Sequence, residues 1–584
     1  MADTTPTTAL APSHGGAPRL WPLAIVLAVQ ALAIVVSLTP SVPNLPRFVA
    51  MMAGPALAIL LFAVWLLGLS RLTWRERGLI ANFVALPCVA LQPVAQETSG
   101  LLLWIYGLPL AIFTATVALW LTRTSEPNTR LKVVGALTVV AWIPFMLVRV
   151  DGFVGDYRPE LSWRWSPTPE EQMLASRGGV AEQPAAEGAV LTLQPGDWPA
   201  YRGAARNGRA ATPPLGLDWS TNSPREVWRI DVGPGWSSFI HVDGRLFTQE
   251  QRGEQEAVTC YDAATGSELW TSAYDGRFTE VVSGAGPRAT PTYHDGRVFA
   301  LGALAVLSAC DAATGEVVWR RDLVADMGAV VPMWGASASP LVAGGHVIAY
   351  LDGADGRGLA AFDPATGVER WTRGWNGMNY GSAQPARLAD EELVLFTHGE
   401  GLSAIDPSDG SVTWTFLPSG WKGVPMIQPQ AVDADTVLVA LGDGVGIARL
   451  EVARDGDAWT IEEAWSSKRM RPSFNDFVVH EKHVYGFDQS ILTCIELGTG
   501  ERAWRRGRYG FGQLVLLEDV DALLVGAESG DLALVSTDPT EQRELGRIEL
   551  LDGKTWNHPI VVEDRVFTRN GETAVCVELP SVVQ

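Results

Sequence analysis

A short pattern that recurs through the last two thirds of the chain constrains its fold more than any other feature. In each copy an apolar run is followed by Asp, two or three small residues, Gly and then Trp, as in the segment Tyr261–Trp270 (YDAATGSELW). Internal repeats of this kind indicate a fold built from similar structural units. Good copies end at Trp270, Trp319, Trp371, Trp414 and Trp504, diverged copies end at Trp465 and Leu545, and Trp228 precedes the first copy.

The spacing of the copies matches one blade of a β-propeller. Successive copies are 39 to 52 residues apart, and a four-stranded blade takes about 40 to 50 residues. Between copies lie a polar residue, an apolar strand, a Gly/Asp turn and a second strand, and eight such pieces can be counted. The sequence therefore predicts an all-β eight-bladed propeller over residues 197–584.

Both ends of this segment supply strands to what we predict is a single blade. The last unit, residues 558–579, provides three strands, whereas the strand Glu226–Gly233 stands unpaired at the start. A ring closed by strands from both ends leaves no blade with an incomplete edge. We therefore expect the eighth blade to combine these two segments.

The residue types in the repeat have a structural explanation. Asp accepts hydrogen bonds from backbone amides two residues on, and Gly adopts a positive φ, so the pattern closes a tight turn between strands. Trp buries a large ring between neighbouring blades, while its indole N–H bonds a nearby carbonyl. We therefore expect structural docking, and no catalysis, from six of these residues: Trp270, Trp319, Trp371, Trp414, Trp465 and Trp504.

Residues 20–150 differ in composition and predict an α-helical membrane domain. Five apolar stretches each approach the roughly 20 residues that cross a bilayer, and only helices satisfy their own backbone there. Gln30, Asn82 and Gln92 are polar exceptions, which either pack helices together or line a lipid-quinone pocket. The predicted transmembrane helices cover Leu20–Leu38, Phe48–Leu69, Gly78–Ala95, Leu101–Leu121 and Leu131–Val148.

Basic residues predict the orientation of these helices. Lys and Arg in short loops stay on the cytoplasmic side of a membrane, and they occur here in alternate loops. The predicted topology has a cytoplasmic tail at residues 1–19, five crossings and a propeller outside the cytoplasm. A bacterial inner membrane with a periplasmic propeller is the predicted location. The loop cations are Arg71, Arg75 and Arg77 in one loop and Arg123, Arg130 and Lys132 in another.

Charge and composition restrict the partners. Residues 1–150 carry nine Lys and Arg against four Asp and Glu, so the remaining residues have a net charge of −26. Such an acidic part repels phosphate backbones, which excludes nucleic acid as a partner. Residues 151–196 are rich in Pro, Ala, Gly and Glu and predict an extended linker. The lipid bilayer is the one partner that the sequence itself implies.

The repeat resembles the tryptophan-docking repeat of pyrroloquinoline-quinone (PQQ) propellers, A-x-D-x-x-T-G-x-x-x-W. The chain from Asp197 onward is similar to the PQQ-like propeller family of bacteria, which contains quinoprotein alcohol and glucose dehydrogenases. The family also contains non-enzymatic scaffolds, such as the propeller lipoprotein of outer-membrane protein assembly. The five-helix start resembles membrane-bound glucose dehydrogenase, which passes electrons to lipid quinone. However, the chain has no adjacent Cys-Cys pair, no C-x-x-C-H motif and no long inserted loops.

A candidate site follows from aligning the residue with which each inner strand starts. This residue and the one two positions earlier lie on the same strand face, so they predict a polar and aromatic ring at one mouth of the central channel. Alternatively, polar residues simply line a narrow channel filled with water. The first set is Ser238, Thr290, Ser339, Gln384, Gln428, Asp476, Gln513 and His558, and the second is Trp236, Arg288, Ser337, Ser382, Met426, Phe474, Phe511 and Trp556.

From these two sets, together with Asn475 beside Asp476, we select nine ligand-binding candidates. Asp476 is the one acid in the ring, and it is the weak candidate for a catalytic base. With Asn475 it is also the candidate ligand for the Ca²⁺ that accompanies PQQ, although Ca²⁺ needs several oxygen ligands. We expect no metal site at His558, because zinc sites need three or four ligands together. The nine are Trp236, Arg288, Gln384, Gln428, Asn475, Asp476, Gln513, Trp556 and His558.

The cysteines are expected to be unpaired. Cys260, Cys310, Cys494 and Cys576 occupy similar places in different blades, whereas Cys88 lies in a predicted transmembrane helix. Corresponding strands of separate blades are too far apart for a disulfide, whose Cα atoms lie within about 7 Å. Buried free thiols are therefore expected.

Two functional hypotheses remain from the sequence. The first is a membrane-anchored, extracytoplasmic propeller without a cofactor, which binds a partner protein or an envelope polymer as a non-catalytic scaffold. The alternative is a PQQ- and calcium-dependent membrane dehydrogenase of alcohols or sugars that passes electrons to lipid quinone. Because one fold serves both kinds of protein, only the site can distinguish them.

Overall fold

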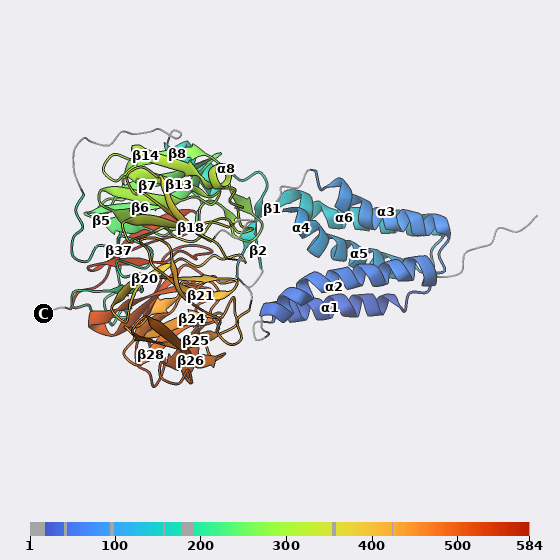
Figure 1. Cartoon of the computed structure of the whole chain (residues 1–584). Helices are drawn as coiled ribbons and strands as arrows, with labels where there is room; N and C mark the ends of the chain where they lie inside the picture. Colours follow the sequence, from blue (N-terminus) through green and yellow to red (C-terminus); the bar gives the residue numbers. More distant parts are fainter. Residues whose placement is uncertain are drawn as a thin grey trace, which may run out of the picture. The chain divides into compact units, whose positions relative to one another are not determined.

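The computed structural model consists of two compact units, Met1–Ser166 and Pro167–Gln584 (Figure 1). The described residues are 18–39, 42, 44–93, 99–155, 158–177, 191–352, 358–375, 377–422 and 424–582. Most of the predicted cytoplasmic tail, residues 1–17, lies outside them.

The first unit is mainly helical, and each of the five predicted transmembrane segments overlaps a described helix. Three described helices, Pro46–Leu69, Leu103–Leu121 and Pro127–Leu147, are long and apolar enough to cross a membrane. The first and third helices have 16 and 17 residues, so the five-crossing topology stays a prediction. The elements are α1 (Leu23–Leu38), α2 (Asn44–Val64), η1 (Trp65–Leu69), α3 (Trp74–Ala90), α4 (Ser99–Leu102), η2 (Leu103–Gly107), α5 (Leu108–Leu121) and α6 (Pro127–Leu147).

Polar contacts join the helices of this unit. The buried Arg130 at the start of α6 pairs with Glu76 at the start of α3, with 2.9 Å between Nη1 and Oε1. Gln30 Nε2 donates to the carbonyl of Pro109 on α5 at 3.3 Å, whereas Asn82 bonds within its own helix. The starts of α3 and α6 therefore lie on the same side of the helical unit.

The segment predicted as an extended linker contains regular structure. The hairpin of β1 (Val148–Phe153) and β2 (Pro159–Trp163) precedes the helix α7 (Pro169–Arg177). Thr168 and Glu171 form reciprocal hydrogen bonds at the start of α7, which is the capping arrangement that starts helices. The prediction of an extended linker is wrong for these residues, because the Thr168–Glu171 cap starts a helix within a Pro-rich stretch. The Ala/Glu-rich part, residues 178–190, lies outside the described residues.

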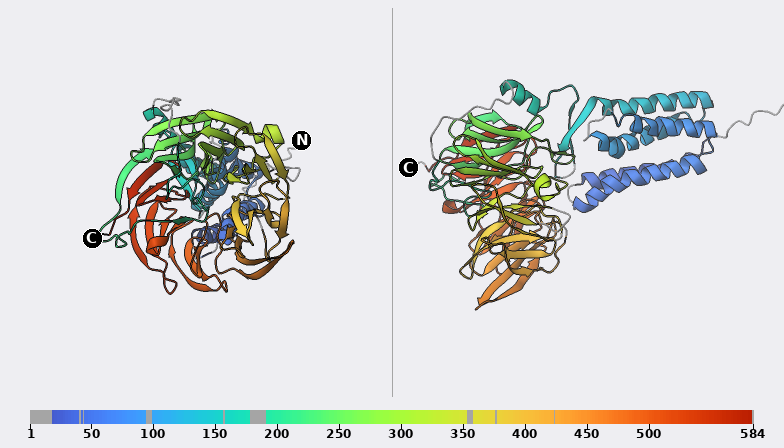
Figure 2. Two further views of the ribbon diagram at one scale, coloured as in Figure 1. Left: turned by 60° about the vertical axis from the view of Figure 1, so that its left-hand side comes forward. Right: turned by 45° about the horizontal axis from the view of Figure 1, so that its top comes forward.

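In the second unit, the described strands form eight antiparallel blades, which follow one another around a ring (Figure 2). The first strands of neighbouring blades contact each other and surround the hub. Blades 1 to 4 comprise β5 (Ile240–Val242), β6 (Arg245–Arg252), β7 (Gln255–Asp262) and β8 (Glu268–Asp275); β11 (Thr292–His294), β12 (Arg297–Leu301), β13 (Val306–Asp311) and β14 (Val317–Asp322); β15 (Leu341–Ala343), β16 (His346–Tyr350), β17 (Leu359–Phe362) and β18 (Glu369–Arg373); and β19 (Gln384–Leu388), β20 (Glu391–His398), β21 (Gly401–Ile405) and β22 (Val412–Phe416).

Two of the other four blades, blades 7 and 8, include strands from the start of the unit. Blades 5 and 6 comprise β23 (Gln430–Ala431), β24 (Thr436–Ala440), β25 (Ile447–Asp455) and β26 (Ala458–Ser467); and β27 (Val478–His480), β28 (His483–Asp488), β29 (Ile491–Glu496) and β30 (Arg502–Arg508). Blades 7 and 8 comprise β31 (Gln513–Leu517), β32 (Ala522–Gly526), β33 (Asp531–Ser536) and β34 (Glu544–Glu549) with β3 (Arg209–Ala210); and β35 (Ile560–Val562), β36 (Arg565–Arg569) and β37 (Thr573–Glu578) with β4 (Arg225–Asp231). Short elements between blades are β9 (Thr279–Glu280), β10 (Gly284–Ala285) and α8 (Leu323–Met327), whereas η3 (Glu518–Val520) joins β31 to β32 within blade 7.

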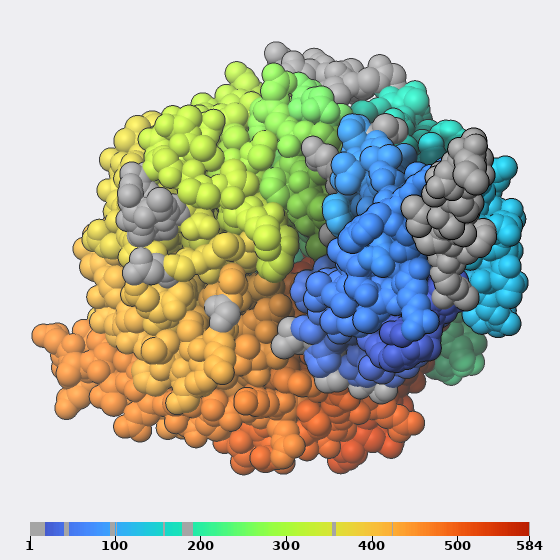
Figure 3. All heavy atoms as spheres, turned by 90° about the vertical axis from the view of Figure 1, so that its right-hand side faces the viewer, coloured from blue at the N-terminus to red at the C-terminus, as the bar shows by residue number. Residues whose placement is uncertain are grey.

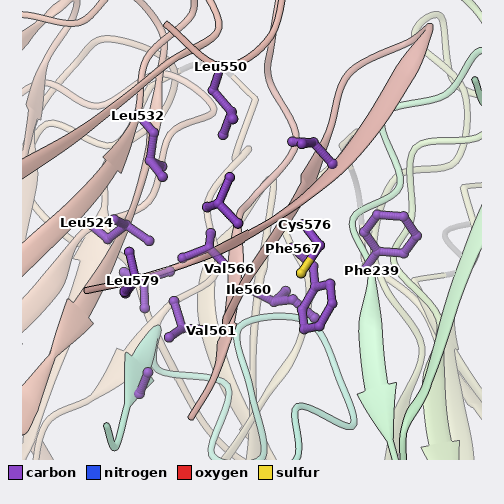
Figure 4. Close-up of a cluster of buried hydrophobic side chains, with 14 of the residues drawn as sticks. Phe239, Leu524, Leu532, Leu550, Ile560, Val561, Val566, Phe567, Cys576 and Leu579 are labelled. Atoms are coloured by element: carbon purple, nitrogen blue, oxygen red, sulfur yellow. The ribbon is translucent and has the colours of Figure 1, made fainter. Parts of the chain in front are cut away.

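The predicted closure of the ring is confirmed. Strand β4 pairs antiparallel with β37, so the last blade combines strands from both ends of the unit. A large apolar cluster packs around this closure and includes Phe239, Leu524, Val566, Phe567 and Cys576 (Figure 4). Because burial of such side chains contributes about 1.5 to 3 kcal/mol each, closure is strongly favoured. All five cysteines of the chain are buried and free.

The repeat pattern places each Trp against the next blade. Trp270 Nε1 donates to the carbonyl of Ala312, in the following turn, at 3.1 Å. A Cβ on Gly315, whose φ is +78°, would lie 2.6 Å from the Trp270 ring. The Gly is therefore needed both for the turn and for contact with the indole. The same donation joins Trp228 to Ala263, Trp319 to Pro364, Trp371 to Pro407, Trp465 to Leu497 and Trp504 to Asp538.

Two blades depart from this arrangement. The Trp414 indole nitrogen has no hydrogen-bond partner among the described residues, because blade 5 has the long hairpin β25–β26 in place of the short turn. In blade 7 the residue opposite Leu534 is Gly546, one residue after the predicted Leu545. Eight residues separate Val535 from its partner Glu544, against six between Tyr261 and Glu268 in blade 1. The turn is therefore longer in blade 7, and Trp219 from the start of the unit packs on Gly546.

Removal of one docking Trp should destabilise the propeller. We expect Trp270→Ala, at a fully buried position, to lower the free energy of unfolding by about 3 to 5 kcal/mol, because the mutation leaves a cavity between two blades. Urea titration of the full chain measures this. Val368→Ala, at a half-exposed position of the propeller, is the control and should change stability by less than about 0.5 kcal/mol. Equal stability of both variants would contradict the docking role.

Candidate functional site

The first set of aligned hub residues forms a belt of hydrogen bonds between blades. Thr290 accepts from the Ser238 amide at 3.2 Å, Ser339 from the Thr290 amide at 2.9 Å, and Ser238 from the His558 amide at 2.8 Å. Gln513 accepts from the Asp476 amide at 3.4 Å. In blade 4 the hydroxyl in this role belongs to Ser382. All eight residues of the first set are buried, so most of their polar groups hold the blades together.

A segment from the start of the second unit passes through the hub, and we call residues 201–206 the plug. Trp198, three residues before the plug, forms a β-bridge with His241 on blade 1. Strand β3, which follows the plug, pairs in parallel with β31 on blade 7. Arg206 Nη1 donates to the carbonyl of Pro340 at 2.8 Å, and Gln428 Nε2 donates to the carbonyl of Arg206 at 2.6 Å. The plug therefore crosses the channel and contacts blades on several sides of it.

The carboxylate of Asp476 is enclosed by the plug. Its Oδ2 accepts a hydrogen bond from the Tyr201 hydroxyl and lies 3.2 Å from His558 Nε2 and 3.7 Å from Arg202 Nε. Arg202 and Asp476 are each 2% exposed, so this ion pair is hidden from solvent. A buried carboxylate with such partners serves as a counter-ion within the fold.

The two titratable groups at the hub have shifted pKa values. Burial opposes ionisation of Asp476, but the charge of Arg202 and the hydrogen bonds from His558 and Tyr201 lower its pKa below the ordinary value of 3.8. Burial lowers the pKa of His558 below its ordinary value of 6.5, against the opposing effect of Asp476. At neutral pH the hub therefore contains an ionised carboxylate and a neutral imidazole.

Four aromatic residues of the second aligned set form what we call the aromatic arc: Trp236, Phe474, Phe511 and Trp556. The Trp236 and Trp556 rings are 5.0 Å apart, as are those of Phe474 and Trp556, and the Phe474 and Phe511 rings are 5.3 Å apart. The four residues precede the inner strands of blades 1, 6, 7 and 8. Except for Phe511, they are partly exposed. The arc therefore presents aromatic surface at the mouth of the channel.

Lys554 belongs to the arc although the alignment missed it. Its Nζ lies 5.3 Å from the Trp236 ring centroid and 4.9 Å from that of Trp556. These are cation–π distances. Trp556 Nε1 in turn donates to Glu528 at 2.8 Å. The sequence places Lys554 two residues before Trp556, which could have indicated a contact between them. Only the fold shows that the Trp236 and Trp556 rings both lie close to the Lys554 ammonium.

Three other sequence candidates have side chains that bond within the fold. The Arg288 guanidinium is buried, donates to Ser283 Oγ at 2.7 Å and lies 3.5 Å from Glu280. Burial lowers the pKa of Arg288 to about 10, against the opposing charge of Glu280. Asn475 donates to the carbonyl of Gln489 at 3.3 Å, and Gln384 accepts from the Ala431 amide. These three side chains are thus used within the fold.

Comparison with a protein family agrees with the repeat architecture. A family profile described as outer membrane protein assembly factor BamB matches residues 219–300 and 254–506. The matched residues lie in the second unit and contain most of its repeats. No curated protein sequence matches the chain.

The chain is also similar to several solved structures. BamB from Moraxella catarrhalis has a TM-score of 0.45 and 16% identity, and covers 61% of this chain and 100% of its own. A europium-containing methanol dehydrogenase has a TM-score of 0.41 and 11% identity, with coverages of 66% and 98%. The quinohemoprotein alcohol dehydrogenase ADHIIG from Pseudomonas putida HK5 has a TM-score of 0.42 and 13% identity, with coverages of 69% and 84%.

The residues at the hub do not fit a calcium ion with PQQ. Ca²⁺ takes six to eight oxygen ligands, and within the described residues no group of three or more His, Cys, Asp or Glu side chains could hold a metal. Asp476 already bonds Tyr201, and the adjacent Arg202 guanidinium would repel a cation. No catalytic step through this cofactor follows from the hub of the PQQ-like propeller.

The hub should make the propeller sensitive to acid. Because the folded pKa of His558 is lowered, the unfolded chain binds its proton first, and stability is lost as pH falls below about 6.5. Asp476 acts in the same direction below its ordinary pKa. We expect His558→Gln to show a smaller drop in thermal midpoint between pH 8 and pH 5 than the wild type, measured by circular dichroism. His346→Gln, at a site away from the hub, is the control; an equal drop in all three proteins would contradict this prediction.

Proposed function

We propose that the protein is a membrane-anchored scaffold whose extracytoplasmic propeller binds a partner protein or an envelope polymer, without catalysis. The observation that carries this proposal is the enclosure of Asp476 by the plug. The one acid of the aligned ring serves the fold, while the aromatic arc remains accessible at the mouth. A propeller with these features suits binding rather than chemistry.

The enclosed hub argues against a central catalytic site. A general base must come within about 2.6 to 3.2 Å of the proton that it removes, directly or through one water. Asp476 is nearly inaccessible, and Tyr201 and Arg202 occupy the space beside its carboxylate. A substrate could approach it only if the plug left the hub, which would expose a buried guanidinium and a buried carboxylate.

The aromatic arc supports binding at the mouth. Trp and Tyr, with Arg, dominate the energetics of protein interfaces, and Met is also enriched there. Trp236 and Trp556 are partly exposed at the arc, and the partly exposed Met426 precedes the inner strand of blade 5. The indole N–H groups of Trp236 and Trp556 donate hydrogen bonds within the fold, so these two rings are held in fixed orientations. Pre-oriented side chains lose less entropy when a partner binds.

The helical unit supports anchoring with the propeller outside the cytoplasm. The ion pair between Glu76 and Arg130, and the contact of Arg75 with Asn128 at 3.4 Å, bring the two basic loops to one side of the helices. Basic loops on one side are typical of the cytoplasmic face. With five crossings and the amino terminus inside, the PQQ-like propeller lies in the periplasm of a bacterial inner-membrane protein.

Binding at the mouth is tested by photo-crosslinking in intact cells. A benzophenone amino acid at Met426 should give a reproducible adduct of one mass, whereas the same group at Val368 should not. Trp556→Ala should reduce the adduct strongly, because loss of a central aromatic residue costs about 2 kcal/mol or more, which is roughly a thirtyfold loss of affinity.

The matched control is Trp459→Ala, which removes another partly exposed Trp on the hairpin β25–β26. It should leave the Met426 adduct unchanged. Adducts of equal yield from Met426 and Val368, or an adduct insensitive to Trp556→Ala, would contradict a partner site at the mouth.

The absence of catalysis is tested with PQQ and calcium. We expect the purified full chain, incubated with both, to reduce an electron-accepting dye with alcohols or sugars no faster than the buffer does, because the hub lacks the ligands for this cofactor. A spectrum of protein purified from its own membrane should show no quinone. Dye reduction that requires PQQ and is abolished by a calcium chelator would favour the dehydrogenase alternative instead.

A further inference from the structure

A cluster of positive side chains lies on blade 6, within a unit that is otherwise acidic. Residues 466–508 carry eight Lys and Arg against five Asp and Glu, whereas the chain after residue 150 has a net charge of −26. This part of the chain belongs to the orange surface in Figure 3. We define the arginine cluster as Lys468, Arg469 and Arg471 in the loop from β26 to β27, with Arg502, Arg505, Arg506 and Arg508 on the outer strand β30.

Three of these guanidinium groups share one carboxylate. Asp488 is buried, and its Oδ1 accepts from Arg471 Nε at 2.6 Å. Its Oδ2 accepts from Arg505 Nε at 2.6 Å and lies 3.4 Å from Arg502 Nη2. One negative charge therefore faces three positive charges. Each of the three arginine side chains remains about 30% exposed, so solvent and solutes reach them.

The remaining cations increase this excess. Arg469 has a single acidic neighbour, Glu501, at 3.5 Å, and both side chains are more than half exposed. Lys468 and Arg506 make no ion pair with the residues that the structure describes. Burial and the neighbouring guanidinium groups lower the pKa of Arg502, against the opposing charge of Asp488. Like charges at such short range repel one another, and an anion bound between them relieves the repulsion.

A hollow of about 490 Å³ lies beside the cluster. Its lining includes the cations Lys468, Arg469 and Arg502, the acid Glu501 and the apolar residues Leu441 and Val445. Arg502 Nε donates to the carbonyl of Arg469 at 3.1 Å, which holds the two arginines beside each other. This volume is within the range of small-molecule sites, about 300 to 1,000 Å³.

Protection of a strand edge does not explain the whole cluster. Charged residues on an outer strand prevent it from pairing with other chains, which accounts for cations on β30. Lys468 and Arg469, however, lie in a loop and line the hollow. Their position is explained by recognition of an anion.

We propose that this hollow binds a phosphate-bearing anion. Guanidinium groups match the geometry of phosphate oxygens, and a lysine adds charge at a point. A phosphate with up to two negative charges balances the excess at the hollow, where three cations face the single acid Glu501. The phosphate is either free or part of a phospholipid headgroup. The site is separate from the aromatic arc, so it does not depend on the proposed scaffold function.

Hydrogen exchange on the full chain tests this site. The protein is placed in nanodiscs of phosphatidylcholine, and millimolar inorganic phosphate is compared with chloride at equal ionic strength. In a second arm the nanodiscs contain phosphatidylglycerol. We expect amide exchange in residues 466–473 and 501–508 to slow by about threefold or more. A response to phosphate identifies a free anion, and a response to phosphatidylglycerol alone identifies a lipid headgroup.

Variants locate the effect. Lys468→Glu with Arg469→Glu should abolish the protection, and both residues are exposed, so the fold should be retained. The matched control is Arg225→Glu with Arg387→Glu, which makes the same change in charge at side chains that are 67% and 68% exposed and should leave the protection intact.

Three outcomes would overturn the proposal. The first is no protection by either phosphate or phosphatidylglycerol. The second is protection that persists in Lys468→Glu with Arg469→Glu. The third is protection by a poly-glutamate peptide but by neither phosphate source, which would indicate an acidic protein partner.

Discussion

The contact between each indole and the turn of the following blade is the interaction on which the second unit depends. It joins a buried ring, an indole N–H and a turn glycine in one arrangement, as Trp270, Ala312 and Gly315 illustrate. Each of these contacts joins only two neighbouring blades. The pairing of β4 with β37 completes the last blade and so closes the ring of contacts. Where the turn is altered, other groups compensate: Trp219 covers Gly546 in blade 7. The rigid ring then places loop residues at fixed positions around the mouth.

The plug gives the hub its chemical character. Without it, Asp476 and His558 would be ionisable groups in an open channel, as the aligned strands suggested. With the plug in place, Arg202 balances the charge of the Asp476 carboxylate and Tyr201 donates a hydrogen bond to it. The hub then becomes part of the folded core. The aromatic arc and the arginine cluster on blade 6 lie outside the enclosed hub and keep partly exposed side chains. This arrangement is the physical basis for proposing binding functions for the propeller.

Local patterns predicted the blades well, because each unit repeats the same turn chemistry and strand alternation. The closure by β4 was also predictable, since an unpaired strand at one end matched a missing strand at the other. The error at Leu545 came from a turn that is two residues longer than in blade 1, so that Gly546 takes the position of the Trp. The helix α7 was missed because its short cap lies within a Pro-rich stretch. Alignment of the inner strands brought together the residues of the arc, but it did not distinguish accessible side chains such as Trp556 from enclosed ones such as Arg288.

By itself, the sequence determined the number of blades, their closure, the apolar helices and the excess of acidic charge after residue 150. These properties depend on patterns between residues that are near in the chain or that repeat at a constant interval. The tertiary structure decided that Tyr201 and Arg202 enclose Asp476, that Lys554 lies against two indoles and that three arginines share Asp488. The contacts of Asp476 and Lys554 join residues from different blades or from opposite ends of the unit, whereas the three arginines and Asp488 all belong to blade 6. No periodic signal encodes these contacts, because they arise only when the chain folds and brings separate segments together.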